Sequence, residues 1–182
     1  DPFRDMKTFL TELKARGFSG VQNFPTVGTY TAVYRQNIES VGISYDKEVE
    51  MVHIAHEMDL FTSPYAYTIE EAEKMTKAGA DIVVAHCRGT VGGMVGVAAD
   101  GIMTIDEACK KVQDIHDAVT AINPETMVIC HGGPIATPED AAYVLSHTKG
   151  IAGFYGASSA ERLPVEQAIK QQIQAFSAIE LF

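Results

Sequence analysis

The sequence predicts an α/β domain with a parallel sheet, built from five strand–helix units that follow one another. Short apolar runs typical of buried strands alternate with segments in which apolar residues recur at helical spacing. Alternation of this kind implies right-handed βαβ crossovers and parallel strands. With 182 residues and 46% hydrophobic content, the chain can bury one sizeable core, so we expect a single domain over residues 1–182.

A helix that belongs to none of the five units is expected first, from Asp1 to Gly17. Apolar residues recur there at helical spacing, and Asp1-Pro2 is a typical helix start. Glycine is a common residue at the end of a helix, which places the end of this one near Gly17.

Each later element has a signal in its own sequence. The predicted helices begin at a capping residue with acidic residues in the first turn, Asp46 being the cap expected for the first of them. Pro64 is expected to end the second strand, because proline cannot donate a ladder hydrogen bond. The expected strands are 18–24, 60–67, 81–87, 126–131 and 150–156, and the expected helices are 47–58, 68–79, 104–121, 137–147 and 164–179.

Five β/α units fit two architectures. One is an open, flavodoxin-like sheet, and the other is the last five units of a (β/α)8 barrel, which normally needs about 250 residues. A complete doubly wound domain usually opens with a strand, so the leading helix favours the barrel. On this interpretation the first three barrel strands are absent from the sequence.

Composition excludes several classes of partner. The formal net charge is −10, with 14 basic and 24 acidic residues, so nucleic acid and anionic membranes are not expected to bind. No apolar run approaches the roughly 20 residues that span a bilayer, and no signal peptide is visible. Three widely spaced cysteines without a CxxC pair indicate neither a zinc site nor disulfides, which favours a reducing, cytoplasmic setting.

Two histidines close predicted buried strands, where parallel α/β folds bind their ligands. Because side chains alternate along a strand, His86 should share its face with Val84, and His131 with Ile129, leaving Cys130 toward the helices. Two imidazoles would then face one pocket as general acid, base or electrophile. The alternative is a pair of hydrogen-bonded structural histidines.

Glycine-rich turns follow the last two predicted strands. Their backbone amides can approach a ligand without side-chain obstruction, and the second turn adds hydroxyls and an arginine suited to an anion. In barrels the loops after strands seven and eight often form a phosphate site. The alternative is tight-turn packing with a surface arginine. The candidate anion-binding residues are Gly132, Gly133, Gly156, Ser158, Ser159 and Arg162.

Other candidates follow the earlier strands. Gln22, Asn23 and Tyr65 are placed to orient a carboxylate or carbonyl, and no proton transfer is expected of the two amides. Glu50 is the preferred general base or metal ligand in the first turns of its helix, where the alternative is a solvated carboxylate. GxGxxG, GxxxxGK[ST], HExxH and GxSxG motifs are all absent from the sequence.

Two unusually long connections follow the first and third predicted strands, over 25–45 and 88–103. Both lie on the side of the fold where sites are built, and such loops are commonly lids or binding loops. The alternative interpretation is a surface insertion without a role in the site.

Five segments carry a family resemblance: GVQNFPTVG at 20–28, YDKEVEMV at 45–52, GADIVVAH at 79–86, CHGGPIATPEDAAYVL at 130–145 and GFYGASSAERLPVEQAI at 153–169. Together they resemble the phosphoenolpyruvate hydrolase-like TIM-barrel family, which is related to phosphonopyruvate hydrolase and the phosphoenolpyruvate mutase/isocitrate lyase superfamily. The resemblance covers nearly the whole chain. It implies that 22–24 ends the fourth strand of a (β/α)8 TIM barrel.

The resemblance further implies a small carboxylate or phosphonate-type substrate, such as a pyruvate derivative, with cleavage of a C–P, C–O or C–C bond. It makes a divalent metal such as Mg²⁺ a candidate cofactor, although relatives take their metal carboxylates largely from the part of the barrel absent here. The sequence departs from the family pattern over 29–35 and in the loop after His86.

The resulting prediction is a hydrolase or lyase acting on a small anionic oxo-acid, with His131 and His86 as acid/base or electrophilic groups. The rival prediction is a non-catalytic barrel that senses a ligand or binds a partner within a larger protein. Unpaired strand edges in a partial barrel should also favour a homo-oligomer.

Overall fold

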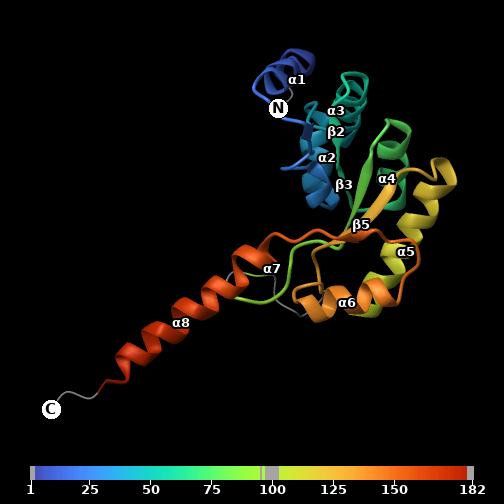
Figure 1. Ribbon diagram of the computed structural model, residues 1–182. Helices are drawn as coiled ribbons and strands as arrows, with labels where there is room; N and C mark the ends of the chain where they lie inside the picture. The colour runs from blue at the N-terminus through green and yellow to red at the C-terminus, as the bar shows by residue number, and fades with distance from the viewer. Residues whose placement is uncertain (1–2, 95, 97–102, 180–182) are drawn as a thin grey trace.

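The computed structural model describes residues 3–94, 96 and 103–179, and shows an α/β fold in which neighbouring strands are parallel (Figure 1). The strands form two sheets, ordered β1-β2 and β3-β4-β5-β6. Sequence order and spatial order therefore agree across both sheets. The strands are β1 Gly20–Val21, β2 Phe61–Thr62, β3 Tyr65–Ala66, β4 Ile82–His86, β5 Met127–His131 and β6 Gly153–Phe154.

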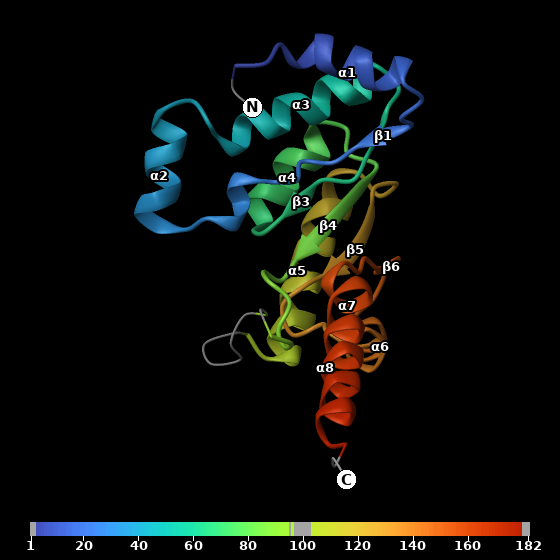
Figure 2. The same ribbon diagram turned by 90° about the vertical axis from the view of Figure 1, so that its left-hand side faces the viewer.

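The helices over 45–57, 69–77, 105–122 and 138–146 pack on one side of the strands (Figure 2). Alternate strand residues such as Ala85 and Cys130 join helix residues in the main core, whereas Val84 and its neighbours form a second cluster on the opposite face. The helices are α1 Met6–Ala15, the 3-10 helix η1 Val27–Thr29, α2 Ala32–Ser40, α3 Tyr45–Glu57, α4 Ile69–Lys77, α5 Ile105–Ile122, α6 Pro138–Ser146, α7 Ser158–Glu161 and α8 Leu163–Ser177.

Three predicted helix starts are confirmed by their caps. The side chains of Thr68, Thr104 and Thr137 each accept a hydrogen bond from a first-turn amide of α4, α5 and α6. The predicted cap of α3 is wrong: Ser44 caps it by accepting from Lys47 N, and Asp46 lies within the first turn.

The predicted strand over 60–67 is interrupted at Pro64. Its first half, β2, pairs with β1, and its second half, β3, pairs with β4. Pro64 has no amide to donate, but its carbonyl accepts from Val84 N at 2.9 Å. The segment therefore joins the two sheets instead of ending at the proline. The strands expected over 18–24 and 150–156 are shorter than predicted, because only two residues of each pair with a neighbour.

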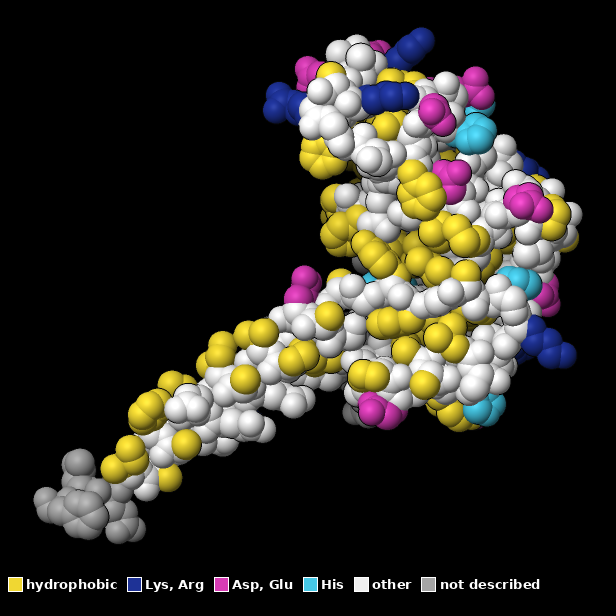
Figure 3. All heavy atoms as spheres, in the orientation of Figure 1, with side chains coloured by type: hydrophobic (Ala, Val, Ile, Leu, Met, Phe, Trp, Pro, Cys, Tyr) yellow, Lys and Arg dark blue, Asp and Glu magenta, His cyan; other side chains and the backbone are white. Residues whose placement is uncertain are grey.

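The two ends of the chain differ from the expected helices. α1 begins after Asp5, whose side chain accepts from Thr8 N at 2.8 Å, while Asp1 and Pro2 lie outside the described residues. α8 extends away from the sheets, with Pro164 in its first turn (Figure 1). Apolar side chains are visible along its surface in Figure 3. None of its side chains whose exposure is known is buried.

The two long connections differ in how much of each the structure describes. Residues 25–45 contain η1 and α2, whereas 88–103 is only partly described. Within the described part of the chain, β1 pairs only with β2, and β6 only with β5. No helix in that part is long and apolar enough to cross a membrane.

Candidate functional site

The histidines at the ends of β4 and β5 are direct partners in the sheet. The register pairs Val84 with Ile129 and His86 with His131. Cys130, which lies between Ile129 and His131 in β5, is buried in the core on the helix side. The predicted side-chain alternation is therefore confirmed, and both imidazoles lie on the face opposite the helices.

Three tyrosines surround these imidazoles, and we call the five residues the histidine–tyrosine layer: Tyr65, Tyr67, His86, His131 and Tyr155. The two imidazole centroids lie 4.5 Å apart, edge to face. Tyr67 stacks on His86 at 4.3 Å, and Tyr65 stacks on His131 at 5.2 Å. Each strand of the four-stranded sheet, or the residue that directly follows it, thus contributes a ring to one continuous aromatic surface.

The tautomer of His131 follows from its backbone partner. Its Nδ1 lies 2.5 Å from the carbonyl oxygen of Tyr155. A carbonyl can only accept, so Nδ1 carries the proton and Nε2 of the neutral ring keeps its lone pair. Burial lowers the pKa of His131, which keeps the ring neutral, although the bond to Tyr155 acts in the opposite direction.

His86 has the opposite tautomer. Its Nδ1 accepts a hydrogen bond from the backbone N–H of Arg88 at 2.9 Å, so the proton of the neutral ring lies on Nε2. Burial lowers the pKa of His86 to about 3, with further contributions from His131, Lys111 and Arg88. The ring is therefore neutral near pH 7.

The two imidazoles thus offer complementary Nε2 atoms, a donor on His86 and an acceptor on His131. Among the described residues, every buried side-chain nitrogen or oxygen has a hydrogen-bond partner. Neither Nε2 atom has one there, so both must be open to solvent. A donor and a base side by side can stabilise a developing oxyanion and remove a proton.

Positive charge lies close to this pair. Lys111 Nζ donates to the carbonyl oxygen of His86 at 2.9 Å, and burial lowers the pKa of Lys111. The charges of Lys111 and Arg88 both act on His86. An anion beside the imidazoles would therefore meet a favourable field. No pattern in the sequence indicated Lys111, because it lies in the middle of α5, far along the chain from any predicted strand end.

Glycine is required at positions 132 and 133 because the loop after β5 packs closely against the backbone that follows β4. Both have positive φ, and a Cβ on either would come within 2.3 Å of a carbonyl oxygen of Arg88 or Cys87. Gly133 N donates to Arg88 O at 2.8 Å, so this amide is already used within the fold. Their role as ligand-binding amides stays a prediction.

The loop after β6 is tied to another part of the chain. Arg162 Nη1 donates to Gly92 O at 3.1 Å and pairs with Glu166 at 3.2 Å, while Glu166 accepts from Met94 N at 2.8 Å. The predicted anion contact of Arg162 is therefore occupied by a carboxylate and a backbone carbonyl. Ser158 and Ser159 are the first two residues of the short helix α7.

The side chains of the two residues that follow β1 hold the two sheets together. Asn23 Oδ1 accepts from Tyr65 N at 2.7 Å, and its Nδ2 donates to Glu48 Oε2 at 2.6 Å. Gln22 Nε2 donates to Ser63 O at 3.1 Å. Both side-chain amides thus have hydrogen-bond partners within the protein, and Asn23 links the end of β1 to β3.

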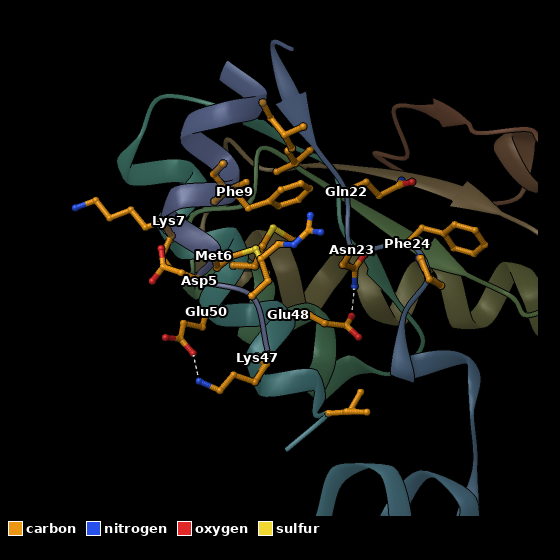
Figure 4. Close-up of a pocket in the computed structure, with 18 of the residues that line it drawn as sticks. Asp5, Met6, Lys7, Phe9, Gln22, Asn23, Phe24, Lys47, Glu48 and Glu50 are labelled. Atoms are coloured by element: carbon orange, nitrogen blue, oxygen red, sulfur yellow. Dashed lines mark hydrogen bonds and ion pairs between the residues drawn. The ribbon is translucent and has the colours of Figure 1, made fainter. Parts of the chain in front are cut away.

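The half-buried carboxylate of α3 is Glu48, whereas the role predicted for Glu50 stays a prediction. Figure 4 shows Glu48 directed toward Asn23, whereas Glu50 points away and pairs with Lys47 at 2.6 Å. Glu50 has a side chain that is 54% exposed, as expected for a solvated first-turn residue. Burial raises the pKa of Glu48, against hydrogen bonds from Thr26, the amide of Val27 and Asn23 that lower it.

A cavity of about 740 Å³ lies beside these residues, between α1, β1 and α3 (Figure 4). Apolar side chains such as Phe9, Leu13, Phe18 and Met51 line it, and neither histidine of the layer does. Its position along the unpaired side of β1 suits packing by another segment better than catalysis.

The described residues do not supply the ligand set that the divalent metal suggested by the family resemblance would need. Within the described ranges, no group of three histidine, cysteine, aspartate or glutamate side chains could hold a metal ion.

Comparison with known proteins places these features in a family. A family model described as phosphoenolpyruvate hydrolase-like matches residues 1–179. The ToMV susceptible protein tm-1(GCR26) of Solanum lycopersicum is 52% identical over 181 residues, covering 100% of this chain and 24% of that protein. The chain thus spans about a quarter of the length of this curated relative.

Solved structures support the fold. A provisionally named phosphonomutase from Burkholderia cenocepacia J2315 aligns with a TM-score of 0.53 at 10% identity, covering 94% of this chain and 88% of that chain. A 2,3-dimethylmalate lyase, a member of the PEP mutase/isocitrate lyase superfamily, aligns with a TM-score of 0.55 at 12% identity, covering 96% and 60% respectively. At such identities the similarity establishes the fold alone.

Proposed function

This chain belongs to the phosphoenolpyruvate hydrolase-like family, and from that premise we propose that it hydrolyses or cleaves a small anionic oxo-acid resembling phosphoenolpyruvate or phosphonopyruvate. The observation that carries the proposal is the pair of neutral imidazoles with opposite Nε2 roles. The family name supplies the substrate class, and the site supplies groups suited to it.

In the proposed hydrolysis, water attacks the phosphorus atom and gives its proton to Nε2 of His131. The P–O or P–C bond breaks, and the enolate oxygen of the leaving pyruvate accepts a hydrogen bond from Nε2–H of His86. Return of the proton to carbon completes pyruvate, with phosphate as the second product. Lys111 and Arg88 supply the field that favours the anion, as their action on His86 suggests.

We also propose that the five units form an arc of a (β/α)8 barrel in a cytoplasmic homo-oligomer. Parallel strands in sequence order, with β1 and β6 unpaired on one side among the described residues, support the arc. Three free, buried cysteines support the reducing compartment. Light scattering of the purified protein tests the oligomer, and a monodisperse monomer contradicts it.

Turnover by matched asparagine variants tests the catalytic proposal. Asparagine can keep the backbone partner of either ring, donating to Tyr155 O in H131N and accepting from Arg88 N in H86N. We expect H131N to lose roughly 10²–10⁴-fold in kcat for pyruvate release, because no base remains. Unchanged melting temperatures confirm folding, and unchanged kcat in both variants contradicts the mechanism.

The rival function is a non-catalytic ligand-binding module. It is favoured by the match to a quarter of a tomato protein named for virus susceptibility. Calorimetry with phosphoenolpyruvate and phosphonopyruvate separates the two functions. Binding without pyruvate release, whether or not Mg²⁺ or Mn²⁺ is added, supports the module and overturns the enzyme.

A further inference from the structure

Helix α2 lies on the surface but reaches a buried carboxylate. None of its residues is buried. Arg35 extends from it to pair with Glu71 of α4 at 2.6 Å, and Glu71 is only 4% exposed. Glu39, one turn further along α2, also pairs with Arg35, at 3.0 Å.

Glu71 uses its second oxygen to hold the backbone of Tyr67. Its Oε2 accepts from Tyr67 N at 2.8 Å, while Thr68 caps α4 by accepting from Glu71 N. In an ordinary capping box this carboxylate would return to the amide of the cap residue itself. Here it binds one residue earlier, so one side chain fixes both Arg35 and Tyr67.

Tyr67 in turn holds the ring of His86. Their rings stack at 4.3 Å with planes 20° apart. The Tyr67 hydroxyl lies 3.0 Å from Thr29 Oγ1, and the ring packs closely on Gly28, where a Cβ would come within 2.5 Å. The phenol is therefore fixed at its backbone, face and hydroxyl, and its free face orients the imidazole.

We propose that Glu71, held by Arg35, is a positioning residue that orients His86 through Tyr67 and couples helix α2 to the site. No contact links Glu71 to His86 directly, so its effect passes through the backbone and ring of Tyr67. The catalytic meaning of this coupling rests on the proposed function, whereas the orientation of the rings does not. A purely structural ion pair would leave His86 unmoved when it is removed.

Proton NMR of His86 in the purified protein tests the coupling. The stacked Tyr67 ring shifts the carbon-bound imidazole protons of His86, and Y67L defines the signal without that ring. We expect E71A to move the His86 signals most of the way toward their Y67L positions, and R35Q to move them in the same direction by less. E39Q, which removes only the outer ion pair, should leave them in place.

The outcomes separate this proposal from the proposed function. If the His86 signals in folded E71A and R35Q match the wild type, the proposal is overturned, whatever the activity. Should E71A fail to fold, R35Q decides alone. If pyruvate release is measurable, E71A should lower kcat about tenfold with little change in KM, and E39Q should change neither. Absence of turnover in the wild type overturns the enzyme but leaves the NMR result decisive.

Discussion

The loops after β5 and β6 both begin with a glycine turn, yet the two turns occupy very different surroundings. The Gly132-Gly133 turn lies against the backbone that follows β4, and its preceding His131 is only 7% exposed. The Gly156–Ser159 turn follows a two-residue strand at the end of the sheet and is partly exposed. A strand that is paired on both sides, as β5 is, therefore encloses the residues at its end more than a glycine turn does.

Alanine at the two glycine turns should separate them most strongly. G133A places a side chain at φ +59 and within 2.3 Å of Cys87 O, so we expect a loss of about 3 kcal/mol in the free energy of unfolding. G156A meets the rotatable hydroxyl of Ser159 and the edge of Phe154, so a loss under about 1 kcal/mol is expected. Urea unfolding measures both, and equal losses would remove the distinction.

Acid should weaken the fold through His86, which ends β4 and lies against the Gly132-Gly133 turn. The folded pKa of His86 is about 3 and its unfolded pKa is near 6.5, so the unfolded chain binds more protons between these values. The contribution is complete above pH 6.5 and declines as the pH falls toward 3, by at most about 1.4 kcal/mol per pH unit.

Unfolding free energies of the wild type and H86N, measured from pH 7 to 4, check this dependence. H86N should show a shallower decline with acid. H147N, which changes an exposed histidine at the end of α6, serves as the matched control and should follow the wild type. Parallel curves for H86N and the wild type would show that His86 does not carry the acid sensitivity.

Alanine substitution of the two serines should have a smaller effect on catalysis than H131N. If Ser158 and Ser159 hold substrate oxygens as the sequence predicts, the double variant should raise KM about thirtyfold, since each of the two lost hydrogen bonds is worth roughly 1 kcal/mol. Steady-state kinetics with phosphonopyruvate provide the measurement. A fall in kcat as large as that of H131N would place the chemistry at the β6 loop instead.

The smallest effect is expected for R162K. Lysine keeps the charge near Glu166 and Gly92 O but loses the second guanidinium nitrogen, so stability should change by about 0.5 kcal/mol or less. Substrate affinity should stay within about twofold, because the guanidinium already has protein partners. Calorimetry that shows a tenfold weaker affinity would restore Arg162 as an anion contact.

Much of the fold could be predicted because its signals are local. Threonine caps with acidic first turns identified α4, α5 and α6, and side-chain alternation placed both histidines on one face. Strand lengths could not be predicted, since the pairing of β1 and β6 depends on distant neighbours. The cap predicted for α3 was wrong because Ser44 is distinguished only by its contact with Lys47 N, and the half-buried position of Glu48 likewise depends on contacts with distant residues.

That His86 and His131 end parallel strands and face the same side follows from the local sequence, because a strand's period of two depends on covalent geometry alone. The protonation and the surroundings of each imidazole depend on how the chain packs. The hydrogen bonds with Arg88 N and Tyr155 O place the ring proton on Nε2 of His86 and on Nδ1 of His131. Lys111, which is 25 residues from His86 along the chain, adds a positive charge beside it. Hydrogen bonds and Coulomb interactions act through space, so the tautomers, pKa values and free faces of the two histidines exist only once the strands and helices have packed.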